Sequence, residues 1–144
     1  MLGIEKETFQ IGYDFDRPIE RMIEAGQYGW SDPDLANPGH GFSIKGHGKG
    51  VIAVVLFHFI GANKVVTSRQ AITEMKKDDS IRLPMIEDLL ALGEVHPGLQ
   101  EKIPIAALRP DNHFIPYLGW RKRYGRIASF FWTGDFWGPA WRRC

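Results

Sequence analysis

The residues from Val51 to Ile60 form the most apolar stretch of this chain and constrain its fold more than any other feature. The first seven of them are uninterrupted apolar residues, many of them β-branched, which favours a strand. This run is far shorter than the roughly 20 residues that a bilayer-spanning helix needs. A strand that is apolar on both faces must also be covered on both faces. We therefore expect residues 51–60 to form a central strand in the sheet of a globular domain.

Local patterns before this stretch predict a strand, a helix and a loop. Apolar and polar residues alternate over residues 9–15, which indicates a half-buried strand. Asp16 is a candidate N-cap for a helix that begins near Pro18 and ends at Gly26. The residues that follow are rich in Asp, Pro, Asn and Gly, which is typical of a loop. We expect the ring of Trp30, within this loop, to pack against the core from outside.

Two further helices are predicted in the middle of the chain. Thr67 and Gln70 fit a capping box, so a helix is expected from there to about Asp78. A second helix is expected over residues 84–92, because its apolar residues recur at helical spacing and Gly93 can end it.

Short strands are predicted on either side of these helices. A strand at 42–44 should form a hairpin with residues 51–60 through the glycine-rich residues 46–50. No helical periodicity follows residue 103, and short strands are expected over residues 103–108, 114–118, 126–132 and 136–142. The length of 144 residues and this order predict a single α+β domain, with short helices packed on antiparallel sheets and a C-terminal part rich in loops and strands.

Charge and aromatic residues are distributed unevenly along the chain, although the net charge is only +1. Residues 1–38 hold three basic and eight acidic side chains, whereas residues 109–144 hold seven basic and two acidic ones. Ten of the eighteen aromatic residues fall between Phe114 and Trp141, including four of the five tryptophans. Any function that the sequence reveals should therefore reside in the C-terminal quarter.

The sequence lacks the residues that several kinds of catalytic and metal-binding site need. Cys144 is the only cysteine, which excludes an internal disulfide, a cysteine-based zinc site and a CxxC redox pair. The five histidines show no HxH or HxxxH spacing, and no GxSxG sequence is present. Residues 109–112 are similar to the Pro-Asp loop of sugar-binding lectins, but no Trp-Asn-Asp sequence follows to complete a calcium site. We therefore expect no enzyme activity, no cofactor and no tightly bound metal.

The N-terminal residues do not resemble an export signal. Glu5, Lys6 and Glu7 stand where a secretory signal needs an apolar stretch. Because no transmembrane segment is visible either, we expect no membrane partner, and the cytoplasm is the default location.

The basic and aromatic C-terminal quarter favours binding. Residues 120–126 combine arginines and a lysine with Trp120 and Tyr124, and such residues bind phosphates and stack on bases in nucleic-acid-binding proteins. Residues 130–141 contain many aromatic side chains. Only about half of them can be buried in a core, because successive side chains of a strand point to opposite faces. The rest should form a binding surface, because Tyr, Trp and Arg dominate interface hot spots. We expect Arg121, Arg123 and Arg126 to lie around the edge of this binding surface.

Several segments together resemble the variable proteins of diversity-generating retroelements, in the small form found in archaea and in bacteria with reduced genomes. The resemblance covers most of the chain and rests on Tyr28-Gly29-Trp30, Phe57-His58-Phe59, Leu89-Leu90-Ala91-Leu92-Gly93, Ile103-Pro104-Ile105-Ala106-Ala107-Leu108, Ile115-Pro116-Tyr117-Leu118 and the Trp- and Gly-rich strands that end in Trp141-Arg142-Arg143. It implies a C-type-lectin-like fold. In that family, reverse transcription with adenine-specific errors rewrites codons near the C-terminus, and the rewritten side chains line a ligand site.

The resemblance also implies which residues would bind the ligand. Residues 1–108 would be the scaffold, and residues 109–144 the variable, ligand-binding region. The positions that would be displayed are Asn112, His113, Trp120, Arg121, Arg123, Tyr124, Phe130, Trp132, Asp135, Phe136, Trp137 and Trp141. The sequence therefore predicts a non-enzymatic module that binds an unknown ligand, expected to be a protein. The alternative interpretation is a small nucleic-acid-binding protein.

Overall fold

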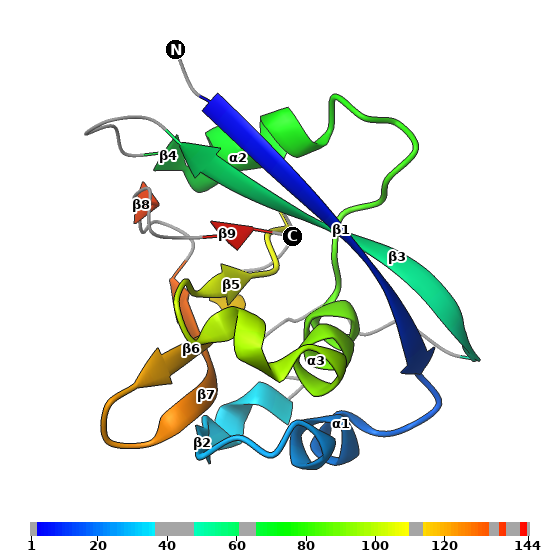
Figure 1. Cartoon of the computed structure of the whole chain (residues 1–144), viewed down its shortest axis with the longest axis vertical. Coiled ribbons are helices and arrows are strands. Elements are labelled where there is room, and N and C mark those ends of the chain that lie inside the picture. Colours follow the sequence, from blue (N-terminus) through cyan, green and yellow to red (C-terminus); the bar gives the residue numbers. More distant parts are fainter. Residues whose placement is uncertain are drawn as a thin grey trace.

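The structure is a computed structural model that describes residues 3–36, 48–60, 66–109, 114–132, 136–137 and 142–143. Its first half contains β1 (Gly3–Asp14), α1 (Ile19–Ala25), β2 (Trp30–Ser31), the 3-10 helix η1 (Pro33–Ala36), β3 (Lys49–Ile60), β4 (Val66–Thr67) and α2 (Ser68–Met75). The second half contains α3 (Ile86–Val95), the 3-10 helix η3 (Pro97–Gln100), β5 (Ile105–Ala106), β6 (Phe114–Arg121), β7 (Gly125–Trp132), β8 (Phe136–Trp137) and β9 (Arg142–Arg143). The fold is therefore α+β, with short helices beside sheets (Figure 1).

Seven strands form one sheet in the order β1-β3-β9-β5-β6-β7-β2, and β4 pairs with β8 in a second, two-stranded sheet. Most pairs are antiparallel, as predicted. Two short pairs are parallel, β2 with β7 and β5 with β9, so the seven-stranded sheet is mixed rather than antiparallel throughout. A parallel pair needs a long crossover connection, and here many elements separate the paired strands in the sequence.

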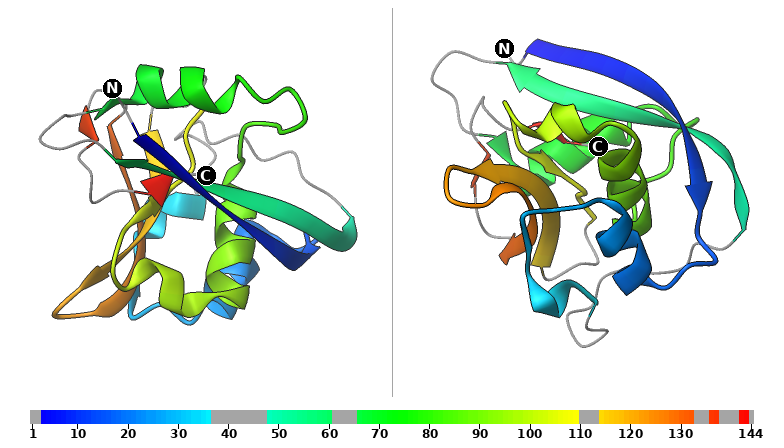
Figure 2. Two further views of the ribbon diagram at one scale, coloured as in Figure 1. Left: turned by 45° about the horizontal axis from the view of Figure 1, so that its top comes forward. Right: turned by 60° about the horizontal axis from the view of Figure 1, so that its bottom comes forward.

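The predicted strand at residues 51–60 is confirmed as part of β3, which is longer and begins at Lys49. It pairs along its whole length with β1, from Gly3 opposite Ile60 to Asp14 opposite Lys49. The two strands form a long twisted ribbon that crosses the molecule (Figures 1 and 2). The predicted partner strand at residues 42–44 lies outside the described residues.

Helix α1 begins later than the sequence pattern indicates. Its N-cap is Pro18, with no side-chain cap, rather than Asp16. The carboxylate of Asp16 instead accepts a hydrogen bond from the backbone N–H of Gly48, at 2.7 Å, and so joins the end of β1 to the start of β3. Gly26 follows the helix as its C-cap, as predicted.

Helix α3 also differs from the prediction, because Gly93 lies within it and His96 is its C-cap. A Cβ atom on Gly93 would lie 2.3 Å from the hydroxyl oxygen of Tyr28 and 2.8 Å from Cδ1 of Leu118. The glycine therefore serves close packing of α3 against its neighbours rather than termination of the helix.

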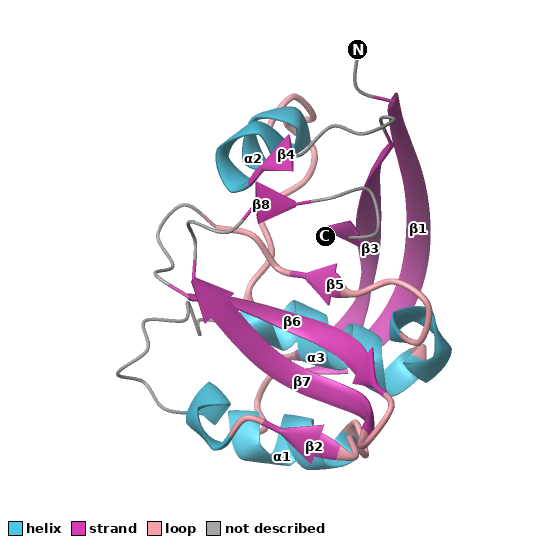
Figure 3. Ribbon diagram, turned by 90° about the vertical axis from the view of Figure 1, so that its left-hand side faces the viewer, coloured by secondary structure: helices cyan, strands magenta, loops and turns pink. Residues whose placement is uncertain are grey.

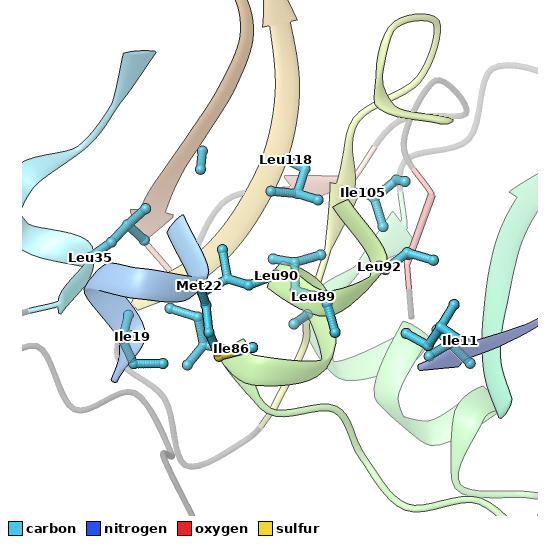
Figure 4. Close-up of a cluster of buried hydrophobic side chains, with 14 of the residues drawn as sticks. Ile11, Ile19, Met22, Leu35, Ile86, Leu89, Leu90, Leu92, Ile105 and Leu118 are labelled. Atoms are coloured by element: carbon cyan, nitrogen blue, oxygen red, sulfur yellow. The ribbon is translucent and has the colours of Figure 1, made fainter. Parts of the chain in front are cut away.

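Two apolar clusters cover the two faces of β3. Leu56 and Val54 belong to the larger one, which is centred on α3 and includes Met22 of α1 and Leu118 of β6 (Figure 4). Phe57 and Phe59 belong to the other, which also contains buried residues of α2. The two sets alternate along β3, as expected for a strand that is apolar on both faces.

Candidate functional site

The described part of the chain has an open depression at the turn end of the β6–β7 hairpin, with a volume of about 530 Å³. Figure 3 shows the hairpin beside β2. The depression is lined by aromatic, basic and a few small or apolar residues: Trp30, Tyr117, Arg121, Lys122, Arg123, Tyr124, Ile127 and Ser129.

Strand register brings these residues onto one face of the sheet. Trp30 of β2 lies opposite Ile127 of β7, and Ile127 lies opposite Gly119 of β6. Tyr117 and Ser129 are the next pair on the same face, because side chains two residues apart point to the same side. Gly119 carries no side chain, and a Cβ atom there would lie 3.1 Å from the Tyr117 ring and 3.7 Å from Ile127.

Two half-exposed rings form one side of the depression. The ring centroids of Trp30 and Tyr124 are 6.0 Å apart with a tilt of 32°. Their exposed fractions are 37% and 42%. The guanidinium of Arg123 lies over the Tyr124 ring, 5.4 Å from its centroid, which is a cation–π arrangement. The site thus offers flat apolar surface next to positive charge.

The cations of the hairpin turn have no carboxylate partner among the described residues. Arg121, Lys122 and Arg123 are consecutive and exposed, and within the described part of the chain their side chains make a single hydrogen bond, a long one of 3.4 Å from Arg121 to the Tyr117 hydroxyl. Elsewhere, described cations do pair with carboxylates: Arg17 with Glu94, Arg21 with Glu24, Lys49 with Asp14, Lys77 with Glu74 and Arg82 with Asp88. The turn therefore concentrates positive charge that the described fold does not neutralise.

A backbone contact holds Trp30 at this site. The N–H of Gly29 donates to the carbonyl of Arg126 at 2.8 Å, beside the short parallel pair of β2 and β7. A Cβ atom on Gly29 would lie 1.6 Å from the carbonyl oxygen of Tyr124. Only glycine permits this approach of the two backbones, so Gly29 fixes Trp30 next to the hairpin.

Arg126 does not rim the depression, contrary to the sequence-based expectation. It pairs with Trp120 across the hairpin, on the face away from the depression. Its guanidinium donates to the carbonyl oxygens of Gly26, Gly93 (2.7 Å) and Pro97 (3.0 Å). It therefore connects the ends of α1 and α3 and the start of η3 to β7.

Gln100 extends this polar network into the interior. Its side-chain amide is buried and donates to the carbonyl oxygens of Gly119, at 2.7 Å, and Ile127, at 3.0 Å. Its side-chain oxygen accepts a hydrogen bond from Arg126 at 3.2 Å. The hairpin that carries the depression is thus fixed from behind by buried and charge-assisted hydrogen bonds.

Tyr28 packs against the same network. Its ring lies under the guanidinium of Arg126, 4.7 Å from centroid to Cζ. Its hydroxyl is buried and has no hydrogen-bond partner within the described part of the chain. Burial raises the pKa of Tyr28 to about 12, with the positive charge of Arg126 acting in the opposite direction.

Tyr28 should make the fold less stable at high pH. The unfolded chain loses the tyrosine proton near pH 10, whereas the folded chain keeps it until about pH 12. The unfolded state therefore binds fewer protons in this window, and the free energy of unfolding falls as the pH rises, by at most about 2.7 kcal/mol. Tyr28→Phe should remove this loss and leave stability at pH 7 unchanged or slightly higher, because the hydroxyl that it deletes has no described partner.

Urea melts of both proteins between pH 7 and pH 11.5 measure the effect. The difference between the two curves cancels the titration of the other tyrosines and lysines. If the curves run parallel across this range, the Tyr28 hydroxyl is not buried as described.

The structure places only some of the sequence-predicted ligand residues in the depression. Arg121, Arg123 and Tyr124 line it. Trp120 is 48% exposed, but it lies on the opposite face of the hairpin, because adjacent residues of a strand alternate. Phe130 is half-buried and packs against the larger apolar cluster.

The remaining predicted positions are described in part or not at all. Trp132 ends β7, and Phe136 and Trp137 form β8, but nothing is described of their side chains. Asn112, His113, Asp135 and Trp141 lie outside the described residues.

Sequence reasoning missed Trp30, which was expected to plug the core. Loop composition around it gave no indication of exposure. The adjacent Gly29 was the available signal, because a glycine beside an aromatic residue permits close approach to another backbone.

Within the described residues, no group of three or more His, Cys, Asp or Glu could hold a metal ion. No described helix has the length and apolar character needed to cross a membrane. Comparison with protein-family models, curated proteins and solved structures found no match to this chain.

Proposed function

We propose that this chain is a non-enzymatic ligand-binding module that recognises a protein through the depression at the end of the β6–β7 hairpin. The observation that carries the proposal is the row of three exposed cations, Arg121 to Arg123, next to the half-exposed rings of Trp30 and Tyr124. These residue types dominate binding hot spots, since they bring a large contact area at low conformational cost. The hydrogen bonds behind the hairpin support it further, because a fixed surface loses little entropy on binding.

We also propose the finer assignments that the resemblance implies, a C-type-lectin-like fold and membership of the retroelement variable proteins. Two observations support them. The C-terminal part is rich in strands, and Trp30, one of the residues that carry the resemblance, lines the depression. Sequencing the DNA beside the gene tests this assignment. It predicts a reverse-transcriptase gene and a near-copy of the 3′ end that differs mainly at adenines, and the absence of both contradicts it.

A nucleic-acid ligand is the second candidate, because three consecutive cations also suit phosphates. The ring geometry excludes only the insertion of a base between Trp30 and Tyr124, and a base can still stack on the outer face of either ring. Stacked bases are about 3.4 Å apart along a strand, so a base between two rings needs about twice that distance. The centroids of Trp30 and Tyr124 are 6.0 Å apart and the rings are tilted, which leaves no room for a base between them.

Charge removal at the hairpin turn should abolish ligand capture without unfolding the chain. The test variant replaces Arg121, Lys122 and Arg123 by alanine, and the matched control replaces Arg69, Lys76 and Lys102, which are also exposed cations. Both should change the free energy of unfolding by less than about 1 kcal/mol in urea melts, because these side chains are exposed. Immobilised native chain and the control should retain the same protein from extracts of the source cells, and the test variant should not.

The salt dependence of capture separates the two candidates. Retention of a protein through these cations should weaken moderately with salt and survive nuclease treatment, whereas retention of nucleic acid should fall steeply with salt and be lost after nuclease treatment. Equal capture by the native chain and the test variant would place the binding site elsewhere.

A further inference from the structure

The positive charge of the hairpin turn exceeds the negative charge that the rest of the chain has left to offer it. A backbone hydrogen bond of 3.1 Å from Tyr124 to Arg121 closes the turn, so residues 121–123 (the turn cations) hold three charges close together. Among the described residues, no carboxylate forms an ion pair with them. The rest of the sequence contains only two carboxylate side chains, Asp111 and Asp135. A ligand that brings several negative charges is therefore the natural counterpart of this turn.

The hydrogen-bond donors of Arg123 are available to such a ligand. Its guanidinium lies over the Tyr124 ring, 5.4 Å from the centroid, and donates no hydrogen bond to the described residues. A guanidinium carries five N–H donors in a planar fork that matches the two oxygens of a carboxylate. The contact with the ring already restricts the side chain, so a bidentate bond to a carboxylate costs less entropy than it would for a free arginine.

The charged and apolar parts of the depression are direct neighbours. Arg123 contacts the half-exposed Tyr124 ring, and the centroid of the half-exposed Trp30 ring is 6.0 Å from that of Tyr124. An anion at Arg123 and an apolar group on these rings would therefore lie within several ångströms of each other. Consecutive Cα atoms of a peptide are 3.8 Å apart, so an acidic residue within two positions of an apolar residue can satisfy both parts.

The arrangement of the turn cations suits several carboxylates better than one phosphate group. A phosphate is a compact dianion, and tight recognition of it requires arginines that converge on one point. The turn cations are exposed. Of the three, only Arg121 is attached to the described floor of the depression, by its hydrogen bond of 3.4 Å to the Tyr117 hydroxyl. Side chains that are spread in this way can pair with separate acidic residues along one segment.

We propose that the depression binds an acidic segment of the partner protein, in which at least two Asp or Glu residues lie within two positions of an aromatic or aliphatic residue. The carboxylates would pair with Arg121 and Arg123, and the apolar side chain would pack on Trp30 and Tyr124. This inference rests on the proposed function, since it names the chemistry of the partner at the same depression. The complementary charge speeds association and rejects basic partners, because like charges repel.

A displayed library of random peptides of about ten residues, the length of a long strand, is the probe for this site. The immobilised full chain should enrich peptides in which acidic and apolar residues are adjacent. The test variant combines Arg121→Glu with Arg123→Glu. The matched control combines Arg69→Glu with Lys102→Glu, which reverses two exposed cations outside the depression. Both variants should remain folded in urea melts, because all four side chains are exposed.

Three results support the proposal together. An enriched peptide, made synthetically, should bind the native chain and the control with equal Kd, and the test variant at least about tenfold more weakly. A peptide of the same composition, with a Gly-Ser spacer between its acidic and apolar residues, should also bind the native chain more weakly, because the two parts of the depression are neighbours. A peptide with Lys in place of its acidic residues should bind the test variant better than the native chain, because both charges are then reversed.

Other results overturn it. These are a library that enriches no peptide, enriched peptides without acidic residues, and peptides that bind the test variant and the control equally. A phosphoserine version of an enriched peptide that binds more than about tenfold tighter than the acidic original would assign the turn cations to a phosphorylated segment instead.

The capture experiment then separates this inference from the proposed function. If the native chain retains a protein that the triple-alanine variant does not, the depression remains the binding site, and only the acidic segment is wrong. If both retain it equally, the proposed function fails as well.

Discussion

Replacement of Gly29 by alanine should destabilise the native fold by about 3 kcal/mol or more. The new Cβ would lie 1.6 Å from the carbonyl oxygen of Tyr124, a backbone atom that no rotamer change can move. The two backbones must therefore separate, and the hydrogen bond from Gly29 N–H to the Arg126 carbonyl is lost with them. Trp30 would leave its place beside Tyr124.

Urea melts and tryptophan fluorescence measure this effect. Gly98→Ala is the matched control, because a Cβ on Gly98 meets nothing within 4 Å. It should change stability by no more than about 0.5 kcal/mol. If Gly29→Ala proved as harmless as Gly98→Ala, the close approach of the two backbones would be wrong, and so would the placement of Trp30.

Arg126→Leu should cost about 3–5 kcal/mol, because it removes several hydrogen bonds from a charged donor, each of which contributes about 1.5–3 kcal/mol. The change leaves the carbonyl oxygens of Gly26, Gly93 and Pro97 without their donor, and it also removes the charge above the Tyr28 ring. Arg126→Lys should recover only part of the loss, because an ammonium group cannot reproduce the planar fork of donors.

The control for this prediction comes from the same hairpin. Arg123 is exposed and has no described ion pair, so Arg123→Leu should alter the free energy of unfolding by about 0.5 kcal/mol or less. Thermal and urea melts measure the stability of Arg126→Leu, Arg126→Lys and Arg123→Leu. Similar losses for Arg123→Leu and Arg126→Leu would mean that the two arginines have similar surroundings, contrary to the contacts described above.

Elements with strong local periodicity could be predicted from the sequence. β3 follows from a run of apolar, β-branched residues, and α1 from apolar residues at helical spacing before Gly26. Long-range pairing could not be predicted in this way. The parallel pairs, β2 with β7 and β5 with β9, involve two-residue segments that carry no pattern of their own.

The candidate site was predictable in its residue types but not in its geometry. The hairpin turn with Arg121, Arg123 and Tyr124 was visible as a basic and aromatic cluster. The neighbouring sequence does not distinguish Arg126 from Arg121. The two arginines differ in their hydrogen-bond partners, because Arg126 donates to carbonyl groups at α1, α3 and η3, which lie elsewhere in the chain. Trp30 was missed for the same reason, since its position depends on β7.

The position of Arg126 on the far side of the hairpin has a consequence for protein engineering. The hydrogen bonds that fix the hairpin from behind join backbone carbonyls to Arg126 and Gln100, and none of these bonds involves the side chains of residues 121–124. The turn can therefore be randomised as a combinatorial library at low cost in folding yield, provided that Gly125 keeps its φ of 75°. This chain would then serve as a small recognition scaffold, in the way that antibody frameworks carry interchangeable loops.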